Sequence, residues 1–136
     1  MKEIFKPGDK KQTRYTVNET DVAAFHGKVV HAVCSTFTLA REIEWATRQF
    51  VLEMRDEDEE GIGTSINIDH QGPAFVGEEI IFTAWVDAIN GHELICTYEA
   101  KVKERVIASG KTRQKILKRD KIVKLFKKTI SKTPLS

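Results

Sequence analysis

Cysteines and long apolar runs are the features that this sequence most lacks. The 136 residues include two cysteines, Cys34 and Cys96, which are too few for a disulfide framework and are not spaced as a zinc-binding pair. No segment approaches the roughly 18 consecutive apolar residues that a membrane-spanning helix needs. Residues 1–7 mix charges with a proline and do not resemble a secretory signal. We therefore expect a cytoplasmic protein with no metal, no membrane role and no redox role.

The composition indicates one globular domain over residues 1–136. Hydrophobic residues make up 40% of the chain and charged residues 31%, as is typical of a soluble chain that buries one core. A second core would have too few residues to form.

The net charge of +2 is unevenly divided along the chain. Residues 1–110 hold 12 basic and 19 acidic residues, whereas residues 111–136 hold 10 basic residues and one acidic residue. Apolar residues recur through this basic tail, first at strand spacing and then at helix spacing. We expect a last strand and an amphipathic helix over about residues 119–130, and no nucleic-acid site.

The longest periodic segment predicts one long helix. Ser35 or Thr36 can cap its N-terminus, and the pattern runs to about residue 54 or 55. The apolar side repeats at about 100° per residue and consists of Leu39, Ala40, Ile43, Ala46, Thr47, Phe50 and Met54. Trp45 and Leu52 lie outside this side and have no cover in a single chain.

Alternating patterns predict strands on both sides of this helix. Before it, residues 12–17 form a strand and residues 20–25 a short capped helical turn. After it, residues 56–63 form an exposed loop. Further strands follow at 64–70, 78–89, 93–104 and 106–117, with Asn90-Gly91 as a hairpin signal between the second and third.

This order favours an α+β fold, in which an antiparallel sheet of about five strands wraps round one central helix and a C-terminal helix follows. Turns separate successive strands, which excludes a doubly wound parallel sheet. Such a sheet covers one side of the helix and leaves a free edge. Together with the uncovered Trp45 and Leu52, this predicts a homodimer.

Glu44 is the first candidate for chemistry. It lies beside Phe37, Ala40 and Val51 on the flank of the apolar side, where a carboxylate loses hydration and needs a partner. A boundary glutamate that reaches solvent or pairs with Arg48 also explains this position.

His70 is the second candidate. Strict alternation places it on the same face as Ile66 and Ile68, at the rim of the core. The strand ends directly after it at Gln71-Gly72-Pro73, and a histidine at such an opening suits acid or base catalysis. A core histidine with satisfied hydrogen bonds is the alternative.

Thr36 is the third candidate. Its hydroxyl lies near the helix N-terminus, where free N–H groups can hold an oxyanion. Helix capping alone also explains it. Glu44 follows eight residues later, about two turns along, so that the two residues flank one groove without touching.

These residues resemble a known family. Val33–Ala46 and Gly63–His70 are similar to segments of the fluoroacetyl-CoA thioesterase family of hotdog-fold proteins, and the resemblance covers roughly residues 10–120. That family has a threonine at the start of the central helix, a glutamate in a Glu-Trp-Ala segment and a histidine ending a Gly-Thr-initiated strand. Thr36, Glu44 and His70 match these by residue type and spacing.

The resemblance implies hydrolysis of acyl-CoA thioesters by a homodimer or a dimer of dimers. Thr36 would orient or supply the nucleophilic oxygen, Glu44 would act as general base or form a transient anhydride, and His70 would transfer protons. No cofactor is implied beyond the CoA of the substrate, whose phosphates would meet basic residues.

Two alternatives stay open: a non-catalytic acyl-CoA-binding or sensing module, and an enoyl-thioester hydratase or dehydratase. The acyl group is a further question. The fluoroacetyl-CoA branch has an aromatic-rich lid before its threonine, whereas residues 27–33 contain no aromatic residue and Phe25 is the nearest. We therefore expect a broader short-chain or medium-chain specificity.

Overall fold

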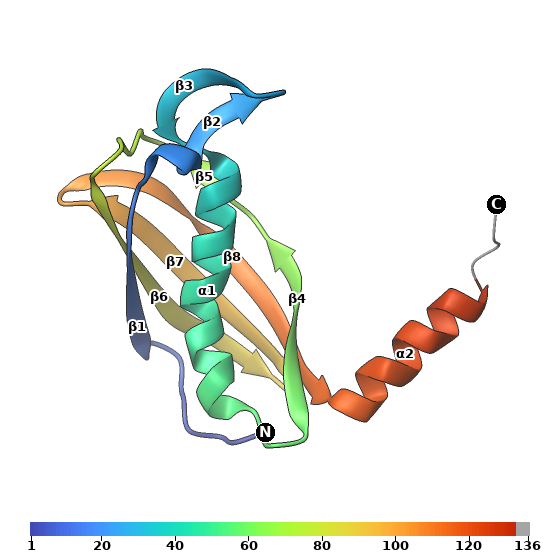
Figure 1. Cartoon of the computed structure of the whole chain (residues 1–136). Helices are drawn as coiled ribbons and strands as arrows, with labels where there is room; N and C mark the ends of the chain where they lie inside the picture. Colours follow the sequence, from blue (N-terminus) through green and yellow to red (C-terminus); the bar gives the residue numbers. More distant parts are fainter. Residues whose placement is uncertain (133–136) are drawn as a thin grey trace.

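The structure is a computed structural model that describes residues 1–132, and it shows an antiparallel sheet curled round one long helix (Figure 1). The elements are β1 (Lys10–Thr16), η1 (Glu19–Asp21), β2 (Val22–Phe25), β3 (Lys28–Cys34), α1 (Thr36–Met54), β4 (Glu59–Ile66), β5 (Asp69–His70), β6 (Glu79–Asn90), β7 (Glu93–Val102), β8 (Arg105–Lys118) and α2 (Arg119–Lys132). The strand order is β1-β6-β7-β8-β4, and β5 pairs with β8. The predicted α+β architecture is confirmed.

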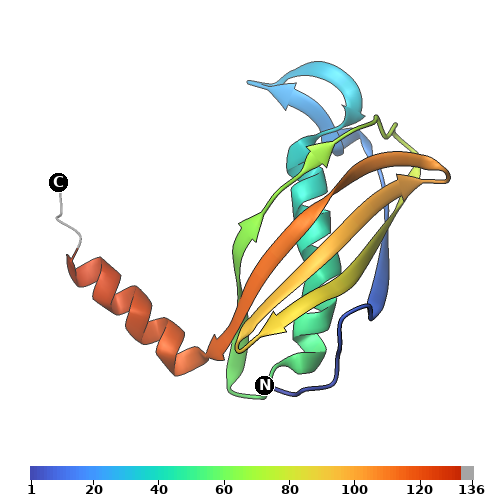
Figure 2. The same cartoon turned by 180° about the vertical axis from the view of Figure 1, so that it is seen from behind.

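α1 packs one face against the inner side of the sheet, and Figure 2 shows the sheet from behind. Its buried residues are Thr38, Leu39, Ile43, Ala46, Thr47, Phe50, Val51 and Met54. This face follows the apolar spacing in the sequence, except that Ala40 is only half-buried. Trp45 lies outside it and is 49% exposed, as expected for a single chain.

The predicted loop over residues 56–63 is wrong in its second half. β4 already begins at Glu59, and Gly61 pairs with Ile116 of β8. A Cβ at Gly61 would lie 2.6 Å from Val51 Cγ1, so only glycine lets β4 approach α1 this closely. Gly61 therefore marks close packing between a strand and a helix instead of a loop.

The predicted strand over residues 64–70 is divided in two. The register between β4 and β8 shifts between Gly63 and Ser65, and β4 ends at Ile66. β5 then resumes pairing with β8 through Asp69 and His70. The predicted alternation nevertheless persists across this break, because Ile66, Ile68 and His70 are half-buried while residues 67 and 69 are exposed.

The helical turn predicted over residues 20–25 is also only partly correct. η1 covers Glu19–Asp21, and the chain then forms a separate hairpin of β2 and β3. This hairpin turns at His26 and Gly27, both with positive φ, and stands at the N-terminal end of α1 (Figure 1). Its side chains are largely exposed.

α2 continues directly from β8, which confirms the predicted C-terminal helix. It extends away from the body in Figures 1 and 2, and none of its described side chains is buried. Within residues 1–132, no helix has the length and apolar character to cross a membrane.

Candidate active site

The N-terminus of α1 is capped by Ser35. The N–H of Thr38 donates to Ser35 Oγ at 3.1 Å, so that Ser35, and not Thr36, is the capping residue. Capping therefore does not explain Thr36. Among the hydrogen bonds of residues 1–132, none engages the N–H of Thr36 or Phe37, which leaves two donors at the helix end.

Thr36 and His70 are brought into direct contact. The distance between Thr36 Oγ1 and His70 Nδ1 is 2.9 Å, although 34 positions separate them in sequence. β5 holds His70 in place by pairing it with Ala108 of β8. A hydroxyl and an imidazole at this distance have the geometry of a nucleophile and its general base.

A buried carboxylate fixes the chain just before Thr36. Asp21 accepts a hydrogen bond from the hydroxyl of Tyr15 at 2.6 Å, and its carbonyl accepts one from the N–H of Ser35 at 2.8 Å. The bond to Asp21 raises the pKa of Tyr15 above its ordinary value of 10.0, so that the phenol stays protonated. Asp21 therefore anchors the corner that presents Thr36.

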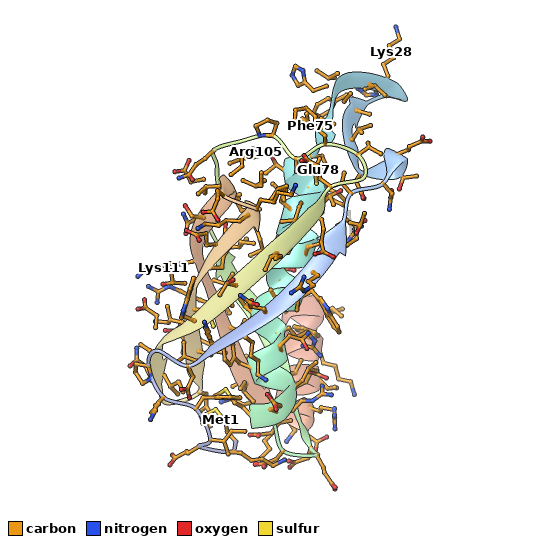
Figure 3. The ribbon with its side chains drawn as sticks, turned by 90° about the vertical axis from the view of Figure 1, so that its left-hand side faces the viewer. Met1, Lys28, Phe75, Glu78, Arg105 and Lys111 are labelled. Atoms are coloured by element: carbon orange, nitrogen blue, oxygen red, sulfur yellow. The ribbon has the colours of Figure 1, made fainter. Side chains whose placement is uncertain are left out.

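The loop after His70 is braced by Arg105 (Figure 3). Its guanidinium pairs with Glu78 at 2.6 Å, donates to the carbonyl of Pro73 at 2.6 Å and lies 5.4 Å from the ring centroid of Phe75. The hydrogen bonds from Arg105 lower the pKa of Glu78 below 4.5, which keeps this pair ionised. The loop is thus tied to the start of β8.

Glu44 lies in a cavity of about 280 Å³ between α1, β4 and β8. Its lining consists of Arg41, Glu44, Trp45, Thr47, Arg48, Gly61, Gly63, Ser65, Thr112, Arg113 and Gln114. The carboxylate lies over β4, since a Cβ at Gly63 would be 3.8 Å from Glu44 Oε1. This cavity lies beside β4, which is an edge strand of the sheet.

The expectation that Glu44 loses hydration is wrong for a single chain, because this residue is exposed. It also does not pair with Arg48, whose guanidinium bonds to Glu60 at 2.9 Å. Burial alone would raise the pKa of Glu60, but the N–H of Gly61 and the guanidinium groups of Arg48 and Arg55 outweigh it and lower the pKa to about 2. Arg48 therefore binds Glu60 of β4 and not Glu44.

The structure joins two of the three candidates and leaves the third apart. Thr36 and His70 touch at the end of α1, whereas Glu44 lies eight residues along the helix, about 12 Å in axial rise. Arg41 lines both the Glu44 cavity and a second cavity of about 540 Å³ beside Thr36. The three residues therefore follow one flank of α1.

The family model for fluoroacetyl-CoA-specific thioesterases matches residues 17–120, which is most of the chain. The chain belongs to this family. The match includes all of α1, β4 and β5, and thus every residue of the flank just described. No curated protein matches the chain.

Solved structures confirm the hotdog fold of this thioesterase family member. A hypothetical protein of Thermus thermophilus, described as a thioesterase superfamily member, is 25% identical, with a TM-score of 0.88 over 95% of this chain and 96% of that one. A variant of the fluoroacetyl-CoA-specific thioesterase FlK is 19% identical, with a TM-score of 0.84 over 93% and 99%. A hot-dog-like protein of Thermanaerovibrio acidaminovorans is 18% identical, with a TM-score of 0.85 over 93% and 94%.

Sequence reasoning missed two polar residues of the cavity in this family member. Thr112 and Gln114 lie on the inner face of β8 and are 2% and 7% exposed, and Gln114 Nε2 donates to Thr47 Oγ1 at 3.2 Å. The sequence pattern could have identified them, because Thr112 and Gln114 alternate in step with the buried Ile116 and polar residues at inward positions of a strand are unusual.

The other candidate ligands and nucleophiles stay outside this site. Burial raises the pKa of Cys34 to about 11, which suits a small buried residue and not a nucleophile. His26, His31 and His92 are exposed. Within residues 1–132, no cluster of three or more His, Cys, Asp or Glu residues is placed to hold a metal ion.

Proposed function

We propose that this protein hydrolyses short-chain or medium-chain acyl-CoA thioesters to the free acid and CoA, using Thr36, His70 and Glu44. The observation that carries the proposal is the 2.9 Å contact between Thr36 Oγ1 and His70 Nδ1, next to two free N–H groups of α1. Nucleophile, base and oxyanion donors are the parts that acyl transfer requires.

The first step uses the end of α1. The thioester carbonyl oxygen accepts hydrogen bonds from the N–H groups of Thr36 and Phe37, which stabilise the negative charge that develops on it. His70 Nδ1 accepts a proton as Thr36 Oγ1, or a water that Thr36 orients, attacks the carbonyl carbon. The imidazolium then returns the proton to the departing thiolate of CoA. Where Thr36 itself attacks, the resulting acyl ester is hydrolysed by a water whose proton His70 accepts and passes back to Thr36 Oγ1, which releases the free acid.

Glu44 acts on the same flank of α1. An acyl-CoA that runs along α1 from Thr36 reaches the cavity around Glu44, because Arg41 lines both this cavity and the one beside Thr36. Because about 12 Å of axial rise separates it from Thr36, the carboxylate serves as general base for water, or as an acyl acceptor, for a thioester whose carbonyl has entered this cavity. Arg41 and Arg113 line this cavity and offer positive charge to the phosphates of CoA.

Related structures support this substrate class. One variant of FlK has been solved with fluoroacetate and CoA and another with acetyl-CoA, at 18% identity to this chain in both cases. We propose that a thioester of CoA binds this protein as well.

A homodimer completes the proposed enzyme. β1 is one edge of the sheet and carries three basic residues among seven, which discourages pairing with another strand. β4 is the other edge, and its residues 61–66 carry no charge. Pairing of two β4 strands would bring the Glu44 cavity and the exposed Trp45 of each copy to the interface. Light scattering should therefore give twice the chain mass of 15.5 kDa.

The decisive test is hydrolysis of a panel of acyl-CoAs, with released thiol as the readout. We expect thiol release that falls sharply in His70→Ala, while His92→Ala, a change at an exposed turn, keeps the wild-type rate. A binding module would bind the same acyl-CoAs without releasing thiol. A hydratase would change the absorbance of enoyl-CoA without releasing thiol.

The same panel tests the acyl preference. β3 contains no aromatic residue and most of its side chains are exposed, so that it excludes water poorly from an acyl chain. We expect the kcat/KM values for fluoroacetyl-CoA and acetyl-CoA to differ by far less than about 10⁴-fold, because one small contact difference is worth only about 10 to 200-fold. A ratio above about 10⁴ would restore the specialised fluoroacetyl-CoA function.

A further inference from the structure

α2 has an apolar side that nothing within residues 1–132 covers. Val123, Leu125, Phe126 and Ile130 are between 45% and 72% exposed. At about 100° per residue they share one side of the helix with Ile122, while the lysines lie on the other side and along both borders. Large apolar groups arranged in this way indicate a docking surface.

The base of α2 fixes its direction. The N–H of Arg119 donates to the carbonyl of Asp58 at 2.8 Å, Lys118 pairs with the Asp58 carboxylate at 2.9 Å, and Arg119 also bonds to the carbonyl of Glu57. From this base the helix projects beyond β4, away from its own body (Figures 1 and 2). Figure 3 places it on the same side of the sheet as α1. α2 therefore reaches the space that a second copy paired at β4 would fill.

The net charges of α2 and of residues 1–118 indicate which surface of a second copy α2 can contact. α2 holds six basic residues and Asp120, a net charge of +5, whereas residues 1–118 hold 16 basic and 19 acidic residues, a net charge of −3. Two α2 helices would repel each other. The body of a second copy is attractive, and its α1 presents the apolar ring of Trp45 beside the carboxylate of Glu44.

We propose that α2 of one copy packs across α1 of a second copy, where it covers the second copy's Trp45 and closes the cavity that holds Glu44. This inference rests on the dimer of the proposed function. The twofold symmetry of such a pair closes both cavities by the same contact. Closure removes Glu44 from water, and a general base gains strength when it loses hydration.

Cross-linking between chains tests the contact without any need for activity. Chains with Trp45→Cys are co-expressed with chains carrying Phe126→Cys, and the disulfide-linked dimer is followed after mild oxidation. The matched control replaces Phe126→Cys by Ser131→Cys, on the opposite side of α2. The native thiols do not compete, because burial raises the pKa of Cys34 to about 11 and of Cys96 to about 12. We expect the Phe126 pair to cross-link much faster; equal rates, or no cross-link, would overturn the proposal.

A second pair of variants tests the consequence for the site. Phe126→Asp and Ser131→Asp add the same charge to opposite sides of α2. In a Trp85→Phe background, we expect Phe126→Asp to shift the emission of Trp45 to longer wavelength and to lower kcat/KM about tenfold or more. Ser131→Asp should change neither.

Three results separate the possible failures. If the wild type releases no thiol yet cross-links and shifts its Trp45 emission as expected, the contact stands and the proposed hydrolysis fails. If Phe126→Asp leaves Trp45 emission unchanged, the contact is wrong. If the wild type floats with phosphatidylglycerol vesicles and Phe126→Asp does not, while no cross-link forms, α2 binds an anionic membrane surface and the proposal is overturned.

Discussion

α1 and α2 are both amphipathic, but among the described residues 1–132 only the apolar side of α1 is covered. α1 buries eight residues against the sheet, including Leu39, Ile43 and Phe50, whereas α2 buries none. The exposed flank of α1 resembles α2 in this respect, because Trp45 and Phe37 stay exposed beside Thr36 and Glu44. The chain therefore satisfies its core alone and leaves its candidate chemistry on the side that faces outward.

This difference divides the expected effects of substitution into two classes. Changes on the buried side of α1 should lower the free energy of unfolding and leave the chemical step intact. Changes on the open flank should lower turnover and leave stability nearly intact. The comparison would be contradicted by a variant on the buried side that loses turnover without losing stability, or by a variant on the open flank that loses stability without losing turnover.

The largest effect is expected on the open flank. His70→Ala removes the group that contacts Thr36 Oγ1 at 2.9 Å, and loss of a general acid or base typically lowers turnover by about 10² to 10⁴-fold. Glu44→Gln should act in the same direction. Thermal melting should stay near the wild-type temperature, because His70 is only half-buried at the end of a two-residue strand. Wild-type rates in both variants would show that the reaction does not use this flank of α1.

The next effect is expected on the buried side of α1. Phe50 is fully buried and makes an edge-on contact with Phe5, with ring centroids 5.0 Å apart. Phe50→Ala should lower the free energy of unfolding by about 3 to 5 kcal/mol, as large core truncations do. The neighbouring Gln49→Ala should change it by less than about 0.5 kcal/mol. Urea titration measures both, and the folded fraction of Phe50→Ala should retain its kcat.

The fold was predictable wherever hydrophobic periodicity was uninterrupted. The 3.6-residue pattern gave α1 nearly to the residue, and alternation with Asn90-Gly91 gave β6 and β7. Prediction failed at Gly61, which reads as a loop residue but allows β4 to approach Val51. Local patterns do not report such close approaches, because the partner lies elsewhere in the sequence.

Candidate site residues could be chosen by residue type, but their geometry could not be predicted. Thr36, Glu44 and His70 were chosen from their places in the sequence, and the structure joins Thr36 to His70 but leaves Glu44 exposed and apart. The burial expected for Glu44 came from a helical wheel, which shows one flank of a helix but not the surface that covers it. That surface requires more than one chain in our proposal.

A smaller effect distinguishes two adjacent residues at the start of α1. Ser35→Ala removes the cap that accepts from the N–H of Thr38 at 3.1 Å and should cost about 1 kcal/mol of stability, within a range of about 0.5 to 2. Thr36→Ala removes no cap and should cost less stability but more turnover. Denaturation measures the loss of stability in each variant, and thiol release measures the loss of turnover. A greater loss of stability in Thr36→Ala would show that Thr36 has a structural role after all.

The smallest effect concerns acid stability at the junction of α1 and β4. Burial would raise the pKa of Glu60, but the N–H of Gly61 with Arg48 and Arg55 lowers it from 4.5 to about 2. A carboxylate with a lowered pKa stabilises the fold fully above pH 4.5 and loses this contribution as the pH falls from 4.5 towards 2. The effect should be modest, because the side chain is 31% exposed and salt screens the pair.

Melting temperatures between pH 6 and pH 2 measure this contribution, at low and at high salt. Glu60→Gln should be less stable than the wild type near neutral pH and should lose less stability on acidification, so that the two curves converge at low pH. Glu57→Gln, a change at an exposed carboxylate before β4, should run parallel to the wild type throughout. If the Glu60→Gln curve also stays parallel, β4 is held to α1 by the close contact of Gly61 with Val51 and not by the ion pairs of Arg48 and Arg55.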